Sequence, residues 1–387
     1  MKLWRILPAL LAGCAAASAC AQDTLKIGVL ASLSGPGAPW GQAILYGTQL
    51  AVDDVNAEGG LTVGGKPYTL QIVAYDDKYQ ANEAVTAANR LIFEDKVKFI
   101  MGPMGGATAL AIGPTTEKNR VITTTMAFTP QALGADKPYT FRPVLTTTET
   151  AQAQIDWVVK TYGIKRVGAL FPNDETGQKI VADLEKAYQH AGAPLAAKEL
   201  FERDRLDMMP LLTRLMARGI DAIELDGNAP ATSGLIVKQA RELGFKGVII
   251  RSGGPATPEI IGVAGAQAAE GMLVYAPIDP ANQDVAAYAQ RYRKTFNKPM
   301  NGFSPSYYDS ARMLFQAIAK AGTTTDTARV AEALAAMRGY HGIMGTLNWT
   351  GQDVYGIARQ VDMPFYVAEV KGGKEVIRAR CTLSECK

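Results

Sequence analysis

Three loops in the first part of the chain combine glycine, hydroxyl and aromatic residues in a way that suits binding of a small ligand. The first loop, residues 32–41, contains Ser34 and Trp40. Backbone N–H groups at a helix start can hold an anion, and an indole ring can lie against an apolar body; alternatively the glycines only make a turn and Trp40 only packs. Two later loops add further candidates: Gly105, Gly106, Thr108, Met126, Ala127, Phe128 and Thr129.

Polar residues also follow the ends of expected strands in the second part of the chain. They are Thr176, Asp226, Asn228 and Arg251. An arginine can hold a carboxylate through two parallel hydrogen bonds. A salt bridge near a hinge, or a solvated side chain, explains Arg251 equally well. Together with the glycine-rich loops, these residues favour reversible binding of a small molecule.

The same residues offer little for catalysis. His190 and His341 are the only histidines, and neither stands in a Ser-His-Asp or metal-ligand pattern. The acid pair Asp53-Asp54 lies on an expected helix face and Asp76-Asp77 follows a strand, where solvation or a salt bridge is usual. The glycine loop lacks the spacing of a nucleotide-phosphate loop. We therefore expect no enzymatic activity, no cofactor and no metal.

The first residues resemble an export signal. Lys2 and Arg5 precede an uncharged, apolar stretch from Ile6 to Ala21, and small residues permit cleavage before Gln22 or before Cys20. We expect residues 1–21 to be a signal peptide and the protein to be periplasmic. The alternative is a lipoprotein signal that ends at Cys14, which would then carry a lipid anchor.

The rest of the chain reads as a globular protein of two domains. Its length exceeds what one hydrophobic core usually supports. The formal net charge is only +3, which gives no basic field for nucleic acid. We expect a monomer. Cys381 and Cys386 lie five residues apart at the C-terminus, and in an oxidising compartment they are expected to form a disulfide.

Short apolar runs alternate with helical patterns along most of the chain. Expected strands in the first half are residues 25–31, 70–75, 97–101 and 121–124, and expected helices are residues 42–56, 83–95 and the segment from 107. After a helix at 151–162 the alternation restarts, with strands at 166–171, 195–201, 222–225 and 247–250 and helices at 176–191, 206–218 and 231–243. Residues 271–276 are expected to leave this second sheet, followed by helices at 285–296, 304–321 and 326–337 and strands at 345–349 and 365–370. Such alternation predicts parallel sheets with helices on both faces.

Several long segments resemble leucine/isoleucine/valine-binding-protein-like receptors, the branched-chain type of periplasmic solute-binding protein of ABC transporters. The segments are LKIGVLASLSGPGAPWGQ (25–42), FIMGPMGGATALAIGP (99–114) and SPSYYDSARML (304–314). The resemblance implies an α/β, type I periplasmic binding protein with two Rossmann-like lobes, parallel sheets and three hinge strands. It also implies a ligand in the cleft and an ABC permease as partner. We assign residues 23–141 and 277–345 to lobe 1 and residues 142–276 and 346–387 to lobe 2.

The chain departs from the amino-acid receptors of this family at both ends of the expected ligand. Gly106 and Phe128 stand where serine and threonine are usual, with Thr108 or Thr129 as the alternative source of a hydroxyl. Residues 252–254 are Ser-Gly-Gly where an acid pairs the ligand ammonium. We therefore expect a small carboxylate with an apolar or aromatic body. If Asp226 or Glu175 pairs an ammonium instead, the ligand is an amino acid. A ligand sensor of the same fold is a further alternative.

Overall fold

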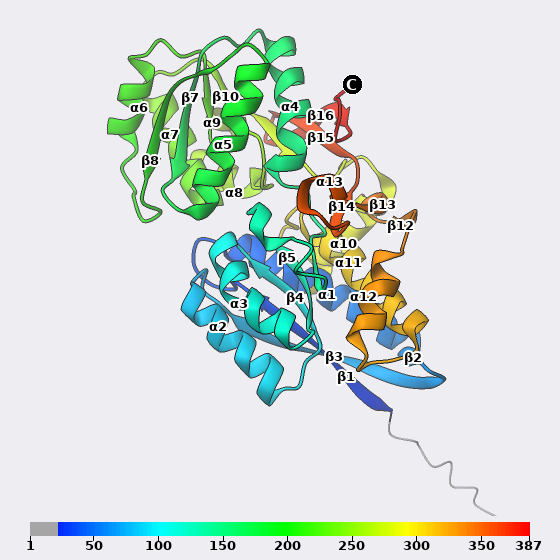
Figure 1. Cartoon of the computed structure of the whole chain (residues 1–387). Helices are drawn as coiled ribbons and strands as arrows, with labels where there is room; N and C mark the ends of the chain where they lie inside the picture. Colours follow the sequence, from blue (N-terminus) through cyan, green and yellow to red (C-terminus); the bar gives the residue numbers. More distant parts are fainter. Residues whose placement is uncertain (1–21) are drawn as a thin grey trace, which may run out of the picture.

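The computed structural model describes residues 22–387, so the expected signal peptide and Cys14 lie outside the described residues. Two large sheets lie in separate lobes (Figure 1). The first sheet has the order β2 (Leu61–Val63), β3 (Lys66–Asp76), β1 (Asp23–Ala31), β4 (Phe99–Met104), β5 (Ile122–Met126) and β6 (Thr140–Phe141). All its neighbours are parallel except the β2–β3 pair. Apolar runs such as β4, buried along its whole length, suit the interior of a parallel sheet.

Helices cover both faces of this first sheet and come from two distant parts of the chain. They are α1 (Ala38–Ala57), α2 (Ala81–Asn89), α3 (Gly106–Lys118), α10 (Gln283–Phe296), α11 (Ser304–Ala321) and α12 (Thr327–Ala335). Close packing of α1 on α11 depends on Gly47, because a Cβ atom there would lie 2.4 Å from the carbonyl oxygen of Ser304. The expected single helix over 83–95 is instead α2 followed by a π-helical turn at Arg90–Glu94.

The second sheet has seven strands in the order β16 (Lys374–Cys381), β15 (Phe365–Lys371), β11 (Leu273–Ala276), β10 (Val248–Arg251), β9 (Ala222–Glu224), β7 (Val167–Pro172) and β8 (Leu195–Phe201). The strands β7 to β11 are parallel to one another, and β15 and β16 are added antiparallel. The expectation that residues 271–276 leave this sheet is wrong. All four residues of β11 are buried, and the strand lies between β10 and β15.

Six helices accompany the second sheet. They are α4 (Thr147–Tyr162), α5 (Glu175–His190), α6 (Met209–Met216), α7 (Pro230–Glu242), α8 (Thr257–Ala264) and α9 (Ala266–Ala269). At the start of α4, the backbone N–H and the hydroxyl of Thr146 both donate to the Glu149 carboxylate, in the manner of a capping box. Gly163 ends the helix with a left-handed conformation, φ 66°, which glycine adopts without strain.

The chain passes between the two lobes three times, after β6, after β11 and before β15 (Figure 1). A small third sheet stands beside the last passage and consists of β12 (Tyr340–Gly342), β13 (Gly345–Thr350) and β14 (Gln360–Asp362), with α13 (Gln352–Tyr355) between the last two. Arg142 of the first passage forms a parallel bridge with Gln360 of the third. Two passages therefore run side by side.

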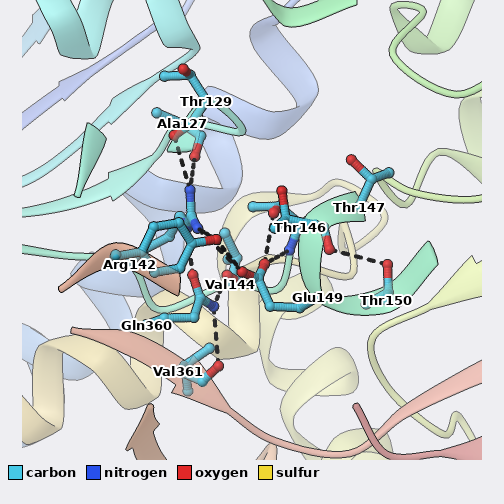
Figure 2. A network of polar contacts seen from close by, with 12 residues as sticks. Ala127, Thr129, Arg142, Val144, Thr146, Thr147, Glu149, Thr150, Gln360 and Val361 are labelled. Atoms are coloured by element: carbon cyan, nitrogen blue, oxygen red, sulfur yellow. Dashed lines mark hydrogen bonds and ion pairs between the residues drawn. The ribbon is translucent and has the colours of Figure 1, made fainter. Parts of the chain in front are cut away.

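Arg142 connects these passages to a loop of lobe 1 (Figure 2). Its side chain is fully buried and donates to the Gln360 amide oxygen. It also donates to the carbonyl oxygens of Ala127 and Thr129, at 3.0 and 3.1 Å, and to the Glu149 carboxylate at 3.4 Å. The loop that follows β5 is thus held by the same side chain that holds the hinge.

Two further features concern the surface and the C-terminus. Within residues 22–387, no helix combines the length and the apolar character that a membrane crossing requires.

The sulfur atoms of Cys381 and Cys386 are bonded to each other. The tail folds back on β16, and the backbone groups of Arg380 and Lys387 exchange hydrogen bonds of 2.8 and 2.9 Å.

Candidate ligand site between the lobes

A small cavity lies between the lobes, at the carboxyl ends of strands from both sheets, where open α/β sheets bind ligands. It leaves about 40 Å³ for the centres of water-sized molecules. A single water needs roughly 10–15 Å³ on that measure, so about three waters fit in the arrangement that the structure shows. The cavity is lined by Trp40, Tyr79, Met104, Gly105, Met126, Phe128, Thr176, Ile180, Arg203, Asp226, Gly227, Arg251, Gly254 and Phe303.

A larger hollow of about 410 Å³ lies beside the small sheet and the second passage. None of the buried side-chain atoms that lack a hydrogen-bond partner, among the described residues, belongs to its lining. The interlobe cavity does have such an atom, on Asp226. The interlobe cavity is therefore the better candidate site.

The walls contributed by lobe 1 are mainly apolar. Met104 ends β4 and Met126 ends β5, and both are buried. Phe128 and Phe303 add aromatic surface. The Trp40 indole N–H reaches across the cleft and donates to the carbonyl oxygen of Pro255 at 3.0 Å. This side of the cavity can enclose an alkyl chain or a ring.

Lobe 2 places a fully buried cation in the cavity. Arg251 ends β10 and is 1% exposed. Its guanidinium donates to the carbonyl oxygens of Gly254 and Asn228 and to the Ser233 hydroxyl, at 2.7, 2.9 and 2.6 Å. These bonds use three of the five N–H groups that an arginine carries. Burial lowers the pKa of Arg251, and the charge of the Asp226 carboxylate opposes that shift.

Two buried carboxylates lie beside this arginine, at the end of β9. Glu224 accepts hydrogen bonds from the hydroxyls of Tyr188 and Ser252 and from backbone N–H groups. Burial, together with the charge of Asp226, raises the pKa of Glu224 to about 7. Asp226 accepts only the N–H of Gly227, at 2.7 Å, and its Oδ2 atom has no partner. Burial raises the pKa of Asp226, and Arg251 partly offsets this.

Two arginine–aromatic pairs join the lobes around the cavity. The Arg203 guanidinium lies 5.2 Å from the centre of the Tyr79 ring, and that of Arg251 lies 5.8 Å from the Trp40 ring. Both aromatic residues come from lobe 1 and both arginines from lobe 2. At Gly105, whose φ is +90°, a Cβ atom would lie 2.7 Å from the Tyr79 ring, so glycine is required there.

Gly106 has a similar steric reason. A Cβ atom at this position would lie 1.8 Å from the Glu175 carboxylate oxygen Oε2 of the opposite lobe. A serine, which the resemblance leads one to expect, would require the end of the flexible Glu175 side chain to move aside. The departure from the family pattern at Gly106 thus accompanies an interlobe contact.

The structure brings seven of the predicted ligand-binding residues to the cavity: Trp40, Gly105, Met126, Phe128, Thr176, Asp226 and Arg251. The other six, Ser34, Gly106, Thr108, Ala127, Thr129 and Asn228, do not line it. Several of these residues use their polar groups in hydrogen bonds within the protein. Ser34 donates to Asp76, Thr108 to the backbone of its own helix start, and Asn228 to two lobe 2 carbonyls.

The sequence reasoning missed other lining residues, notably Tyr79, Arg203 and Phe303. Tyr79 follows β3, so the rule that ligands meet strand ends could have found it. Arg203 follows β8, which is parallel to β7, so the same rule could have found it. Phe303 precedes α11, far along the chain, and only tertiary packing brings it to the cavity.

Comparison with known proteins assigns the family. The sequence profile described as periplasmic binding protein matches residues 24–375. The chain belongs to this family. It is a solute-binding protein, of a class that captures small organic ligands in an interlobe cleft for ABC importers, and the family implies an extracytoplasmic location.

Relatives and solved structures agree with that assignment. The leucine-, isoleucine-, valine-, threonine- and alanine-binding protein of Pseudomonas aeruginosa is 27% identical over 340 residues, which cover 87% of this chain and 88% of the relative. The leucine-binding protein LivK of Thermotoga maritima is 25% identical, with a TM-score of 0.81 over 93% of this chain and 99% of that one. A solute-binding protein of R. palustris in complex with benzoate is 19% identical, with a TM-score of 0.79 over 94% and 98% of the two chains, and shares the fold.

Proposed function

We propose that this binding protein captures a small carboxylate with an apolar or aromatic body and delivers it to an ABC permease. The observation that supports this is the buried Arg251 in a cavity whose other wall is apolar. Among the described residues, no carboxylate forms an ion pair with Arg251 within 4.0 Å. A ligand carboxylate would supply the missing partner through the N–H groups that remain.

A ligand carboxylate should bind at Arg251 because an unpaired buried charge is costly, and that cost falls when a counter-charge enters the same site. The apolar wall around Met104, Met126 and Phe128 then buries the body of the ligand. A ligand that contacts both lobes favours the closed arrangement over an open one, because it binds the closed arrangement more tightly.

An amino acid is the second candidate ligand. The observation that favours it is Asp226, whose unpaired Oδ2 atom could receive an ammonium group. The named relatives include an aliphatic amino-acid binder and a protein crystallised with benzoate, and both bind carboxylates. In both cases the ligand carboxylate binds at Arg251. The two candidate ligands differ in whether they also carry an ammonium group for Asp226.

We propose the following organisation for the mature protein. Residues 1–21 are removed on export to the periplasm, and lipidation at Cys14 is the alternative. Lobe 1 comprises residues 23–141 and 277–345, and lobe 2 comprises residues 142–276 and 346–387, as a monomer that closes about the hinge.

Titration calorimetry on residues 22–387 tests the ligand class. The panel comprises benzoate, 3-phenylpropanoate, 4-methylpentanoate, leucine, valine and phenylalanine, with benzamide and 3-phenylpropanamide as uncharged controls. We expect at least one carboxylate to bind while its amide does not. Equal binding of a carboxylate and its amide would overturn the proposed role of Arg251. The variant Arg251→Met, with its melting temperature as a check on folding, should lose carboxylate binding.

A further inference from the structure

The turn that follows β3 places a large aromatic ring at the wall of the interlobe cavity. We infer that Tyr79 sets the largest ligand body that the site accepts, and that Asp77 is the positioning residue that holds the Tyr79 ring in place. The inference rests on the proposed function, because it concerns the apolar body of the same carboxylate ligand.

The backbone of this turn has a conformation that a tyrosine adopts only at a cost. Among residues 22–387, five non-glycine residues have a positive φ, and Tyr79, with φ 61°, is the one of them that lines the cavity. Its neighbour Lys78 has φ 50°. Residues other than glycine seldom enter this left-handed region, because the Cβ atom comes too close to a carbonyl oxygen. Such strain persists where the surrounding structure enforces it, and here the strained residue is part of a binding cavity.

The Asp77 carboxylate enforces this conformation. Its Oδ1 atom accepts the backbone N–H of Tyr79 at 2.9 Å and the hydroxyl of Ser32 at 2.5 Å. Asp77 and Ser32 are fully buried, so solvent does not compete for these bonds. The preceding acid, Asp76, accepts the N–H of Lys78 at 2.8 Å. Asp77 does not line the cavity, so it acts on the ligand through the turn.

The Tyr79 ring is held from both lobes. On the lobe 1 side it packs against Gly105, where a Cβ atom would lie 2.7 Å from the ring. On the lobe 2 side the Arg203 guanidinium lies 5.2 Å from the ring centre. Arg203 is in turn held by an ion pair with Asp174 and by a hydrogen bond of 3.2 Å to the carbonyl oxygen of Gly227. A longer ligand could displace the ring only by disturbing one of these contacts.

Two series of acids of increasing length test the size limit. One runs from benzoate through phenylacetate and 3-phenylpropanoate to 4-phenylbutanoate, and the other from butanoate to octanoate. Titration calorimetry on residues 22–387 identifies the tightest-binding member of each series, which we call the length limit. We expect affinity to fall beyond this limit in the wild type.

Variants of Tyr79 show whether its ring sets the limit. Tyr79→Ala should raise the affinity of the first acid beyond the limit, relative to the acid at the limit, by about tenfold or more. The reason is that one methylene group in an apolar pocket typically changes discrimination by about 10–200-fold. Tyr79→Phe keeps the ring and should keep the wild-type limit.

Variants of Asp77 test the positioning role. Asp77→Ala removes the acceptor and should move the limit in the same direction as Tyr79→Ala, whereas Asp77→Asn keeps an oxygen acceptor and should keep the wild-type limit. Asp77→Ala combined with Tyr79→Ala should have the same limit as Tyr79→Ala alone, because Asp77 acts through the ring.

Asp309→Ala is the matched control for Asp77→Ala. Asp309 is also fully buried and accepts two backbone N–H groups, at 3.0 and 2.8 Å, but it does not line the cavity. The control should lower the melting temperature and leave the length limit unchanged. A change of limit therefore separates positioning of the ring from a general loss of stability.

The outcomes also separate the inference from the proposed function. If Tyr79→Ala keeps the wild-type limit, the inference is overturned and the carboxylate site stands. If Asp77→Ala keeps the limit, or if Asp309→Ala moves it equally, the positioning role of Asp77 is overturned. If no acid of either series binds the wild type, the proposed function fails, and the inference fails with it. Should an alanine variant not fold, Tyr79→Leu and Asp77→Leu replace it, since leucine supplies apolar volume without the ring or the acceptor.

Discussion

The hinge network around Arg142 makes a strong prediction about stability. We expect Arg142→Met to lower the free energy of unfolding by about 3–5 kcal/mol, as is typical when one partner of a buried ion pair is removed. Methionine has a similar length but donates no hydrogen bond. The substitution leaves the carbonyl of Ala127 and the amide oxygen of Gln360 without their donor from Arg142, and it removes one of two donors to the Thr129 carbonyl.

The magnitude follows from the contacts. Arg142 donates to five acceptors and is fully buried, and a net hydrogen bond contributes about 0.5–1.5 kcal/mol. The Glu149 carboxylate still accepts hydrogen bonds from Thr146 and Tyr355 in the variant. These bonds reduce the free-energy cost of leaving its buried charge without a cation. Removal of a buried guanidinium also recovers part of its desolvation cost. These opposing effects place the loss nearer 3 than 5 kcal/mol.

Urea unfolding of residues 22–387 measures this loss. Arg312→Met is the control, since Arg312 pairs with the exposed Glu58 at 3.3 Å and should contribute at most about 1 kcal/mol. A loss for Arg142→Met no larger than for the control would refute the reasoning. With Glu149→Gln, a double-mutant cycle should show coupling of about 1 kcal/mol or more.

Three further predictions concern other parts of the molecule. Tyr79→Leu should speed ligand release about 3–30-fold in stopped-flow measurements, and Tyr79→Phe much less, because a phenyl ring still faces Arg203; equal rates would contradict the cross-lobe pair. Burial raises the pKa of Asp309 from 3.8 to about 7, so its stabilising protonated form is lost as the pH rises from about 4 to 7. Melting curves recorded over that pH range should show that the free energy of unfolding of the wild type falls by an amount on the order of 2–4 kcal/mol, while that of Asp309→Asn does not. The same pH dependence in both proteins would contradict this prediction. Replacing Cys381 and Cys386 by serine should cost about 2 kcal/mol or less in urea unfolding, because the closed loop is short, and a cost above about 4 would argue against that account.

Most of the fold could be predicted from the sequence, because buried strands and amphipathic helices have distinct periodicities. The bounds of β8 and α11 were predicted to the residue. The two- and three-residue strands β2, β6, β12 and β14 were missed, since so few residues show no period. The eight-residue β16 was missed as well. The place of β11 in the sheet depends on β15, which follows it by almost a hundred residues and gives no local signal.

The site was predictable only in part, for a related reason. Asp226 and Arg251 could be predicted because they follow expected strands, and parallel strands bring their carboxyl ends to one edge of the sheet. The sequence could not show that Thr108 bonds to its own helix start or that Gly106 makes room for Glu175. Both depend on how side chains meet across turns and across the cleft.

The folded-back C-terminus has a consequence for how the protein behaves at high concentration. β16 is an outer strand of the seven-stranded sheet, and an outer strand offers unpaired backbone groups to any other extended chain. The bond from Cys381 to Cys386 turns the tail so that Lys387 takes both backbone groups of Arg380. The end of β16 is thereby closed to strand addition from a second molecule. The disulfide therefore helps to cover one end of an outer strand of this sheet, and an oxidising compartment preserves it.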